Sequence, residues 1–210
     1  IMQSATNEVT EEFKAMGTGR LVVNASGTAL KQGLNATDMQ NIAAIPHVAG
    51  VSPGLSNTVT VKSDKTWVED VTLDEYNEVY FHRNPELVFR GRALNILDVE
   101  SRNAVALVDA TAQKNLFYGQ DPIGKELYIQ GFAYRVVGVL SDADKSDVMA
   151  QAQGGDTDGG RVILPYTTAM TLVGTRNIVS LSVYVEDTVY TDAVQTQLES
   201  VLNAAFNYKD

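Results

Sequence analysis

The amino-acid sequence predicts an α+β fold made of two parts, and three patterns lead to this prediction. Residues 17–62 follow the order strand, helix, strand, strand, and residues 178–206 follow the order strand, helix. The middle third of the chain consists mainly of strand patterns. The chain is therefore expected to combine a strand-rich middle unit with end segments that mix strands and helices.

The N-terminal third contains two helix patterns and three strand patterns. Residues 5–16 carry apolar side chains at helical spacing among acidic ones, which predicts an amphipathic helix that ends at Gly17. Residues 20–24 form the next predicted strand. A helix is expected over 37–45, with Thr37 and Gln40 as its capping box and Pro46 as its stop. Residues 48–51 and 58–62 are expected to be strands joined by a turn that Gly54 forms with Ser56-Asn57.

The middle of the chain combines aromatic residues with strand patterns. A helix is expected over 74–80, a buried strand over 103–108 and a helix from residue 109 or 110 to 117. Residues 125–130 and 132–140 flank Gln130-Gly131, which predicts a hairpin. The aromatic residues concentrated between 67 and 90 are interpreted as packing between two subdomains rather than as a ligand pocket. They are Trp67, Tyr76, Tyr80, Phe81 and Phe89.

The last third begins with a polar excursion. Residues 141–160 hold many Asp and Gly residues and few large apolar ones, so this segment is expected to bury little surface. Beyond it, a strand is predicted over 161–164, a helix over 167–173, a strand over 178–185 and an amphipathic helix over 191–206.

Composition excludes several classes of function. The 210 residues carry a net charge of -10, which disfavours binding to nucleic acid because phosphate backbones would be repelled. The absence of cysteine excludes disulfides, thiolate nucleophiles and cysteine-ligated zinc. The longest apolar stretches are much shorter than the roughly 20 residues that a membrane-spanning helix needs. Because the sequence starts at Ile1 without a signal-peptide pattern, it is interpreted as an internal piece of a longer protein.

Two sequence patterns raise the possibility of hydrolytic catalysis, and both are weak. Residues 50–54 match the pattern G-x-S-x-G around Ser52, but the next residue, Pro53, has no N–H to give to an oxyanion hole. The segment that follows has strand character, whereas the nucleophile elbow enters a helix. His47 and His82 are candidate bases without a catalytic arrangement around them in the sequence. The chain is therefore expected not to be an enzyme.

The sequence gives equally little support to a metal site or a nucleotide site. The segment that begins at Asp142 has oxygen ligands at alternate positions, as a calcium loop does, but Asp147 replaces its glycine and Gln153 its bidentate glutamate. A weak cation site at Asp156 and Asp158 is left open. Gly17-Thr18-Gly19 precedes a strand and lacks the third glycine of a dinucleotide fingerprint. We expect no metal and no cofactor in this domain.

Several segments, in their order along the chain, resemble one family. They are Gly17-Thr18-Gly19-Arg20-Leu21-Val22-Val23, residues 45–53, Gly91-Arg92-Ala93-Leu94 through Asp98, residues 104–108, residues 115–125 and Tyr134-Arg135-Val136-Val137-Gly138-Val139-Leu140. Together they resemble the MacB-like periplasmic core domain, the extracytoplasmic part of ABC transporter permeases of the MacB/FtsX type. The segment 116–125 and the strand around Gly138 are the most specific elements of this resemblance.

The resemblance implies a fold, a location and a mechanism. It implies a discontinuous porter-like subdomain from residues 1–66 and 177–210, with an inserted, β-rich, sabre-like subdomain over 67–176. It also implies an extracytoplasmic domain between two membrane helices, which relays ATP-driven motion to export or extract a substrate. The implied partners are the transmembrane helices of the same permease, a separate cytoplasmic ATPase that binds ATP, a second permease copy and a membrane-fusion-type adaptor.

The residues expected to matter most are those that make the relay stiff. Four apolar residues on the first and last helices are expected to couple the domain to the membrane: Phe13, Leu198, Leu202 and Phe206. Three glycines are expected to be structural: Gly91, Gly124 and Gly138. The alternatives left open are a secreted ligand-binding or adhesion module without a transporter, and a secreted esterase built on Ser52. The transported substrate is not specified by the sequence.

Overall fold

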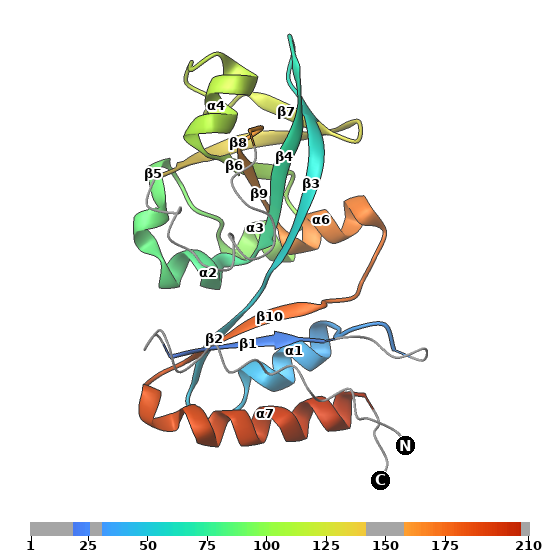
Figure 1. Ribbon diagram of the computed structural model, residues 1–210, viewed down its shortest axis with the longest axis vertical. Helices are drawn as coiled ribbons and strands as arrows, with labels where there is room; N and C mark the ends of the chain where they lie inside the picture. Colours follow the sequence, from blue (N-terminus) through green and yellow to red (C-terminus); the bar gives the residue numbers. More distant parts are fainter. Residues whose placement is uncertain (1–18, 26–30, 142–157, 207–210) are drawn as a thin grey trace. The chain divides into compact units, whose positions relative to one another are not determined.

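A computed structural model describes residues 19–25, 31–141 and 158–206 of the chain (Figure 1). It divides into two compact units. Unit 1 contains residues 1–53 and 175–210, and unit 2 contains residues 54–174. The mixed α+β class predicted from the sequence is confirmed.

Unit 1 is built on a three-stranded antiparallel sheet in the order β1-β10-β2. Its strands are β1 (Arg20–Asn24), β2 (Val48–Pro53) and β10 (Ser180–Val185). Its helices are α1 (Ala36–Ala43), the short 3-10 helix η4 (Thr188–Tyr190) and α7 (Thr191–Ala205). Figure 1 shows α1 and α7 on the same side of this sheet, and the two helices contact each other. The first and last described elements of the chain therefore belong to one unit.

The core of unit 1 follows from the two-residue period of its strands. Leu21 and Val23 in β1 lie opposite Val183 and Leu181 in β10, so alternate side chains reach the same face. Ile42 of α1 and Val194 and Leu198 of α7 are buried with them, as their helical spacing requires. The buried hydrophobic residues of the unit are Leu21, Val23, Ala25, Leu34, Ile42, Ile45, Val51, Ile178, Leu181, Val183, Tyr184, Val185, Val194 and Leu198.

Unit 2 contains a seven-stranded sheet of which six strands close into a ring. The strand order is β5-β8-β6-β9-β4-β3-β7, and β7 also pairs with β8. The strands are β3 (Leu55–Lys62), β4 (Trp67–Tyr76), β5 (Val88–Gly91), β6 (Val105–Val108), β7 (Glu126–Ile129), β8 (Phe132–Leu140) and β9 (Arg161–Pro165). The helices are α2 (Glu78–Arg83), η2 (Pro85–Leu87), α3 (Ile96–Glu100), α4 (Ala110–Phe117) and α6 (Tyr166–Val173).

The length of β8 makes the closure possible. Its first residues pair with β7 from Phe132 to Arg135, and its later residues pair with β6 on the other edge and with β5. All six strands of the ring contribute alternate apolar residues to one buried cluster, which α4 completes with Ala112, Leu116 and Phe117. This cluster is the interior of the barrel-like sheet. A second cluster, with Leu107 and Ile163, lies on the other face of β6 and β9.

Most predicted elements of unit 2 are confirmed. The turn residues Gln130 and Gly131 have φ values of 51° and 85°, so the hairpin between β7 and β8 has the left-handed turn that its sequence indicates. Helix α4 starts at the predicted place because the Asp109 side chain accepts a hydrogen bond from the backbone N–H of Ala112.

Three local predictions are wrong. Residues 74–76 are strand rather than helix, because β4 continues to Tyr76 between β3 and β9. Helix α1 is capped by Asn35 and Asp38 instead of Thr37 and Gln40, since the Asn35–Asp38 pair forms the reciprocal bonds two residues earlier.

The third error concerns Gly54. No turn forms after Gly54, because Leu55 already pairs with Glu75 and Ser56 with Asp74. Strand β3 thus belongs to the sheet of unit 2, whereas the sequence-based boundary at residue 66 placed it with the chain ends.

Candidate functional site

Helix α7 carries three of the four residues expected to couple this domain to its surroundings. Leu198 is fully buried, and Leu202, one turn later, is half-buried. Phe206 follows the last helical residue and is also half-buried. The fourth residue, Phe13, lies outside the described residues. The structure therefore places the described members of this set along one side of α7, with burial decreasing toward its C-terminal end.

The C-terminal end of α7 is held by Lys31, which sequence reasoning missed. The Lys31 ammonium donates a hydrogen bond of 2.8 Å to the backbone carbonyl of Ala205 and one of 2.6 Å to Asp38 Oδ2. It also lies 5.3 Å from the centre of the Phe206 ring, within cation–π range. The last turn of α7 contains no basic residue of its own. A carbonyl at a helix C-terminus carries partial negative charge, so Lys31 supplies the cation that this end lacks.

Asp38 belongs to the same arrangement and organises the start of α1. Its Oδ2 also accepts a 2.9 Å hydrogen bond from the backbone N–H of Asn35, while its own N–H donates to Asn35 Oδ1. The N-terminal end of α1 and the C-terminal end of α7 therefore meet at Lys31. No local sequence pattern predicts this contact, because Lys31 and Ala205 are 174 positions apart.

Two of the three glycines expected to be structural lie opposite each other in unit 2. Gly91 of β5 pairs with Gly138 of β8. A Cβ added at Gly91 would lie 2.3 Å from the Val137 carbonyl oxygen, and one at Gly138 would lie 2.4 Å from the Arg92 carbonyl oxygen. Gly124 differs, since a Cβ there would meet nothing within 4 Å and only its φ of +80° favours glycine. The close approach of β5 and β8 therefore depends on Gly91 and Gly138.

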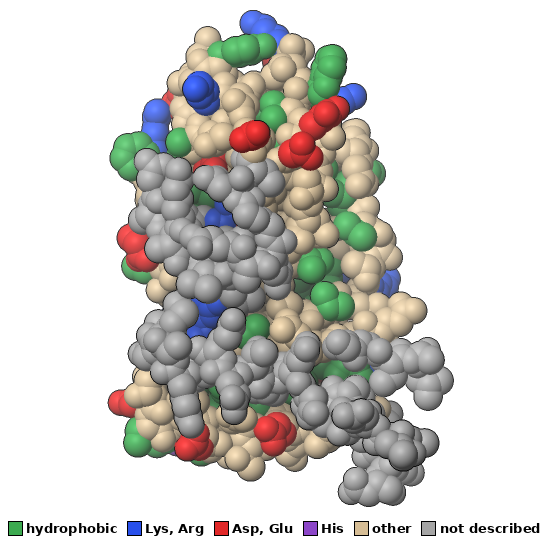
Figure 2. Space-filling model, in the orientation of Figure 1, with side chains coloured by type: hydrophobic (Ala, Val, Ile, Leu, Met, Phe, Trp, Pro, Cys, Tyr) green, Lys and Arg blue, Asp and Glu red, His purple; other side chains and the backbone are tan. Residues whose placement is uncertain are grey.

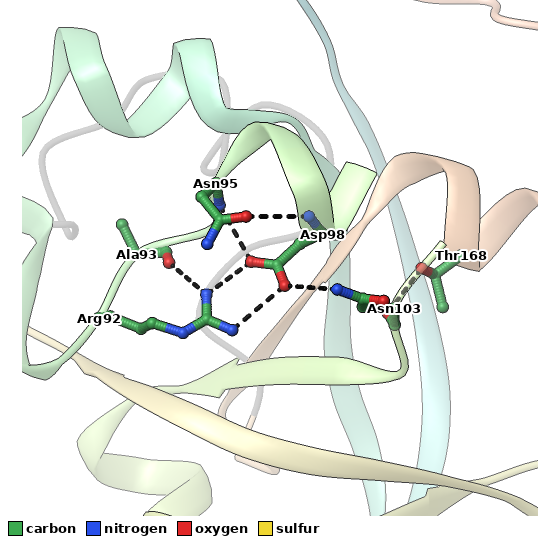
Figure 3. Close-up of polar contacts among 6 residues, drawn as sticks. All are labelled: Arg92, Ala93, Asn95, Asp98, Asn103 and Thr168. Carbon is green, nitrogen blue, oxygen red and sulfur yellow. Dashed lines mark hydrogen bonds and ion pairs between the residues drawn. The ribbon is translucent and has the colours of Figure 1, made fainter. Parts of the chain in front are cut away.

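A buried carboxylate next to this glycine pair fixes the segment between β5 and β6 (Figure 3). Asp98 accepts hydrogen bonds of 2.6 and 3.2 Å from the Arg92 guanidinium and one of 3.1 Å from the Asn103 amide. Burial alone would raise the pKa of Asp98, but these bonds, the Asn95 backbone N–H and the Arg92 charge lower it below its ordinary value. Thr168 of α6 donates to the Asn103 carbonyl, which ties the network to a second helix.

A second buried ion pair, between Arg161 and Asp74, lies in the sheet of unit 2. The Arg161 guanidinium donates to Asp74 Oδ2 and lies 5.9 Å from the centre of the Tyr76 ring. Burial would lower the pKa of Arg161, but the charge of Asp74 holds it above its ordinary value. Next to Asp74, burial raises the pKa of Glu75 to about 7, although a hydrogen bond from Asn57 opposes this rise. Glu75 is thus a buried group that titrates near neutral pH.

The candidate catalytic residues do not come together. Ser52 is buried in β2, and its hydroxyl donates to the Pro53 carbonyl oxygen. His47 Nδ1 lies 3.2 Å from Glu186 Oε2, and its ring stacks on Tyr190. His82 is exposed near the end of α2. The Ser52 hydroxyl and the His47 ring therefore bond to other groups and not to each other, so the geometry does not support the esterase alternative.

The aromatic residues between 67 and 90 separate into buried and exposed members. Tyr76, Tyr80 and Phe81 pack within unit 2, where the Tyr76 and Tyr80 rings are stacked 3.8 Å apart. Trp67 and Phe89 are exposed, at 66% and 77%. The prediction that this group packs between two subdomains is therefore wrong, because its buried members fill the second core cluster of unit 2.

The face of the molecule shown in Figure 2 has no large patch of a single charge among its described residues. Figure 2 shows acidic, basic and hydrophobic side chains interspersed over the described part of the visible face. Within residues 19–25, 31–141 and 158–206, no group of three His, Cys, Asp or Glu residues is placed to hold a metal ion. Most of the segment 141–160, including Asp142, Asp147, Gln153 and Asp156, lies outside the described residues, whereas Asp158 is described and exposed.

Comparison with known proteins settles the family. A family model described as the MacB-like periplasmic core domain matches residues 1–201. The chain belongs to this family. The resemblance seen in the sequence is confirmed, and with it the extracytoplasmic location of this MacB-like domain. In the described part of the chain, no helix has both the length and the apolar character needed to cross a bilayer.

The relatives are much longer than this chain. A macrolide export ATP-binding/permease protein MacB from Azoarcus sp. (strain BH72) is 29% identical over 216 residues, which cover 100% of this chain and 32% of that protein. The protein of the same name from Bartonella henselae is 26% identical and is matched over 93% of this chain and 30% of its own length. The MacB-like chain thus spans about a third of these curated relatives.

Two solved structures share the fold. The periplasmic region of MacB from Actinobacillus actinomycetemcomitans has a TM-score of 0.75 at 22% identity, covering 96% of this chain and 91% of that one. The extracellular domain of the noncanonic ABC-type transporter YknZ from Gram-positive bacteria has a TM-score of 0.73 at 18% identity, covering 90% and 94%. At these identities the likeness concerns the fold.

Proposed function

We propose that this chain is the extracytoplasmic, non-catalytic domain of an ABC transporter permease, and that it relays ATP-driven motion across the membrane to export or extract a substrate. Its relatives are named ATP-binding/permease proteins, and this chain matches about a third of their length. ATP is bound by a separate cytoplasmic subunit or domain, and this domain needs no cofactor. Units 1 and 2 correspond to the porter-like and sabre-like subdomains.

The observation that carries the proposal is that both ends of the described chain build one unit. Strand β1 near the start pairs with β10, and α7 near the end covers the same sheet. Membrane helices that continue from the two chain ends would therefore both act on unit 1. Leu198 is fully buried there, so a displacement of α7 is passed to a close-packed core instead of being absorbed locally.

The proposed partners follow from the family resemblance and from the names of the relatives, which are ATP-binding/permease proteins. They are the transmembrane helices of the same permease, its cognate ATP-binding subunit, a second permease copy and a membrane-fusion-type adaptor. The relatives named for macrolide export make a macrolide the first substrate to examine. The alternative, a secreted ligand-binding or adhesion module, requires no such partners.

The proposal is tested in the complete permease, reconstituted with its ATPase in lipid nanodiscs. Because this chain has no cysteine, a spin label at the exposed position Lys114→Cys reports the distance between the outer domains of two copies. We expect this distance to change between the nucleotide-free and the vanadate-trapped states. In a Leu198→Ala background, we expect most ATP hydrolysis to remain and at least half of the change to be lost.

Glu199→Ala is the matched control, because its exposed side chain lies next to Leu198 on the same helix. It is expected to keep both hydrolysis and the distance change. A parent permease whose distance does not respond to nucleotide would refute the relay. So would a folded Leu198→Ala variant with an unaltered response.

A further inference from the structure

We infer that Lys31 is the positioning residue that fixes the membrane-directed end of α7 to the sheet of unit 1, and that the relay depends on it. This inference rests on the proposed function. It concerns a contact within this chain, between the segment before α1 and the last residue of α7.

The backbone around Lys31 is anchored firmly enough to hold a helix end. Three residues later, Leu34 forms a two-way backbone bridge with Ile178, with distances of 2.9 and 2.7 Å between the donor nitrogen and the acceptor oxygen. The residue before Leu34, Gly33, lies so close to the backbone of Ile178 that a Cβ at Gly33 would be 3.0 Å from the Ile178 carbonyl oxygen. Lys31 therefore extends from a segment that is joined to the chain just before β10.

The side chain of Lys31 makes contacts that only a cation at this position can make together. Its ammonium donates to the Ala205 carbonyl oxygen and pairs with Asp38 Oδ2, and it lies over the Phe206 ring. The Asp38 side chain is only 9% exposed, so the pair is partly shielded from solvent. Lys31 thus joins the first turn of α1, the last turn of α7 and the β10 side of the sheet.

Burial alone would not hold this end of α7. Leu198 is fully buried, but exposure increases toward the C-terminal end, where Leu202 and Phe206 are half-buried. The last turn has no basic side chain to offset its partial negative charge. Without Lys31, a load applied beyond Phe206 would fray the last turn before it displaced the packed part of the helix.

The test uses the complete permease with Lys31→Met, which keeps an unbranched side chain but removes the charge, and Lys31→Arg, which restores it. Lys65→Met removes one positive charge from an exposed position in unit 2 and serves as the control. The readouts are ATP hydrolysis, the nucleotide-dependent distance between copies, and hydrogen exchange of amides 203–206. The last of these donates to the Leu202 carbonyl oxygen.

For Lys31→Met we expect hydrolysis to remain while at least half of the distance change is lost. We expect exchange in amides 203–206 to become about fivefold faster, the size typical of a lost helix-terminus charge. Lys31→Arg and Lys65→Met are expected to behave like the parent. This combination of a local exchange effect with rescue by arginine is not produced by general destabilisation.

Three results would overturn the inference. In the first, Lys31→Met keeps the nucleotide-dependent distance change while Leu198→Ala loses it. This result would refute the role of Lys31 but leave the proposed relay intact. Another is faster exchange throughout unit 1, which would make Lys31 merely structural. The third is an unchanged response in both variants, which would refute the inference and the relay together.

Discussion

The buried carboxyl group of Glu75 predicts that the stability of this domain falls as the pH rises through neutrality. Burial raises the pKa of Glu75 from 4.5 to about 7. The hydrogen bond from Asn57, at 3.4 Å, opposes this rise only in part, and the neighbouring charge of Asp74 adds to it. Between these two values the folded chain keeps the proton while the unfolded chain releases it. The contribution of the protonated Glu75 carboxyl group to the stability of the fold is therefore full below pH 4.5 and is lost as the pH rises through about 7.

The magnitude follows from the two pKa values. At about 1.36 kcal/mol per pKa unit, the whole effect is about 3 kcal/mol, most of which is lost between pH 5 and pH 8. Glu75→Gln has no proton to lose and keeps a similar shape. We therefore expect the variant to be more stable than the parent by about 3 kcal/mol at pH 8 and by less than about 1 kcal/mol at pH 5.

The assay is urea-induced unfolding of parent and variant at both pH values, with the free energy of unfolding extrapolated to water. The quantity that tests the reasoning is the difference between parent and Glu75→Gln, in which the contributions of all other titratable groups cancel. An identical pH dependence in the two proteins would refute the proposed burial of an ionisable Glu75.

Two further predictions concern the glycine pair and the carboxylate of Figure 3. Gly138→Ala places a Cβ 2.4 Å from the Arg92 carbonyl oxygen and 2.8 Å from Leu107 Cδ2, so it should lower the free energy of unfolding by about 3 kcal/mol or more. Gly124→Ala lies in open space at φ +80° and should lower it by about 1 kcal/mol. Urea unfolding of the two variants compares them, and equal losses would contradict the steric argument. Asp98→Asn should cost about 2 kcal/mol at pH 7, because the neutral amide cannot accept both Arg92 bonds. Since the pKa of Asp98 is lowered by these bonds, this difference should shrink as the parent is acidified, and a difference that stays constant down to pH 3 would count against it.

Elements with a local signal were predictable from the sequence. The sequence predicts helix α4 with its start at Asp109 or Ala110, and the structure has Asp109 as its N-cap. The sequence also predicts the β7–β8 hairpin, because Gln130-Gly131 permits the positive φ values that a tight turn needs. The apolar side of α7 follows from its spacing, and the structure buries Val194 and Leu198 as expected. In each case the determining interactions lie within a few residues, so the order of the amino acids suffices.

Elements fixed by distant partners were not predictable in this way. Residues 74–76 have a helical pattern but form a strand, because β3 and β9 supply hydrogen bonds on both sides. The coupling residues Phe13, Leu198, Leu202 and Phe206 follow from the relay that the family resemblance implies and from their places on the first and last predicted helices, and they remain predictions. Lys31 was overlooked, since its significance depends on the carbonyl of Ala205.

The sequence by itself determined the mixed α+β class and most of the secondary structure, because capping, turn and periodicity signals are short-range. It also indicated the family, through the resemblance of several segments along the chain. Only the tertiary structure decided the closure of six strands into a ring, the burial of Glu75 and the meeting of Lys31 with the end of α7. Each of these brings together groups that are far apart along the chain. Their energies depend on distance and burial in the folded state, and a linear sequence specifies neither until the chain has packed.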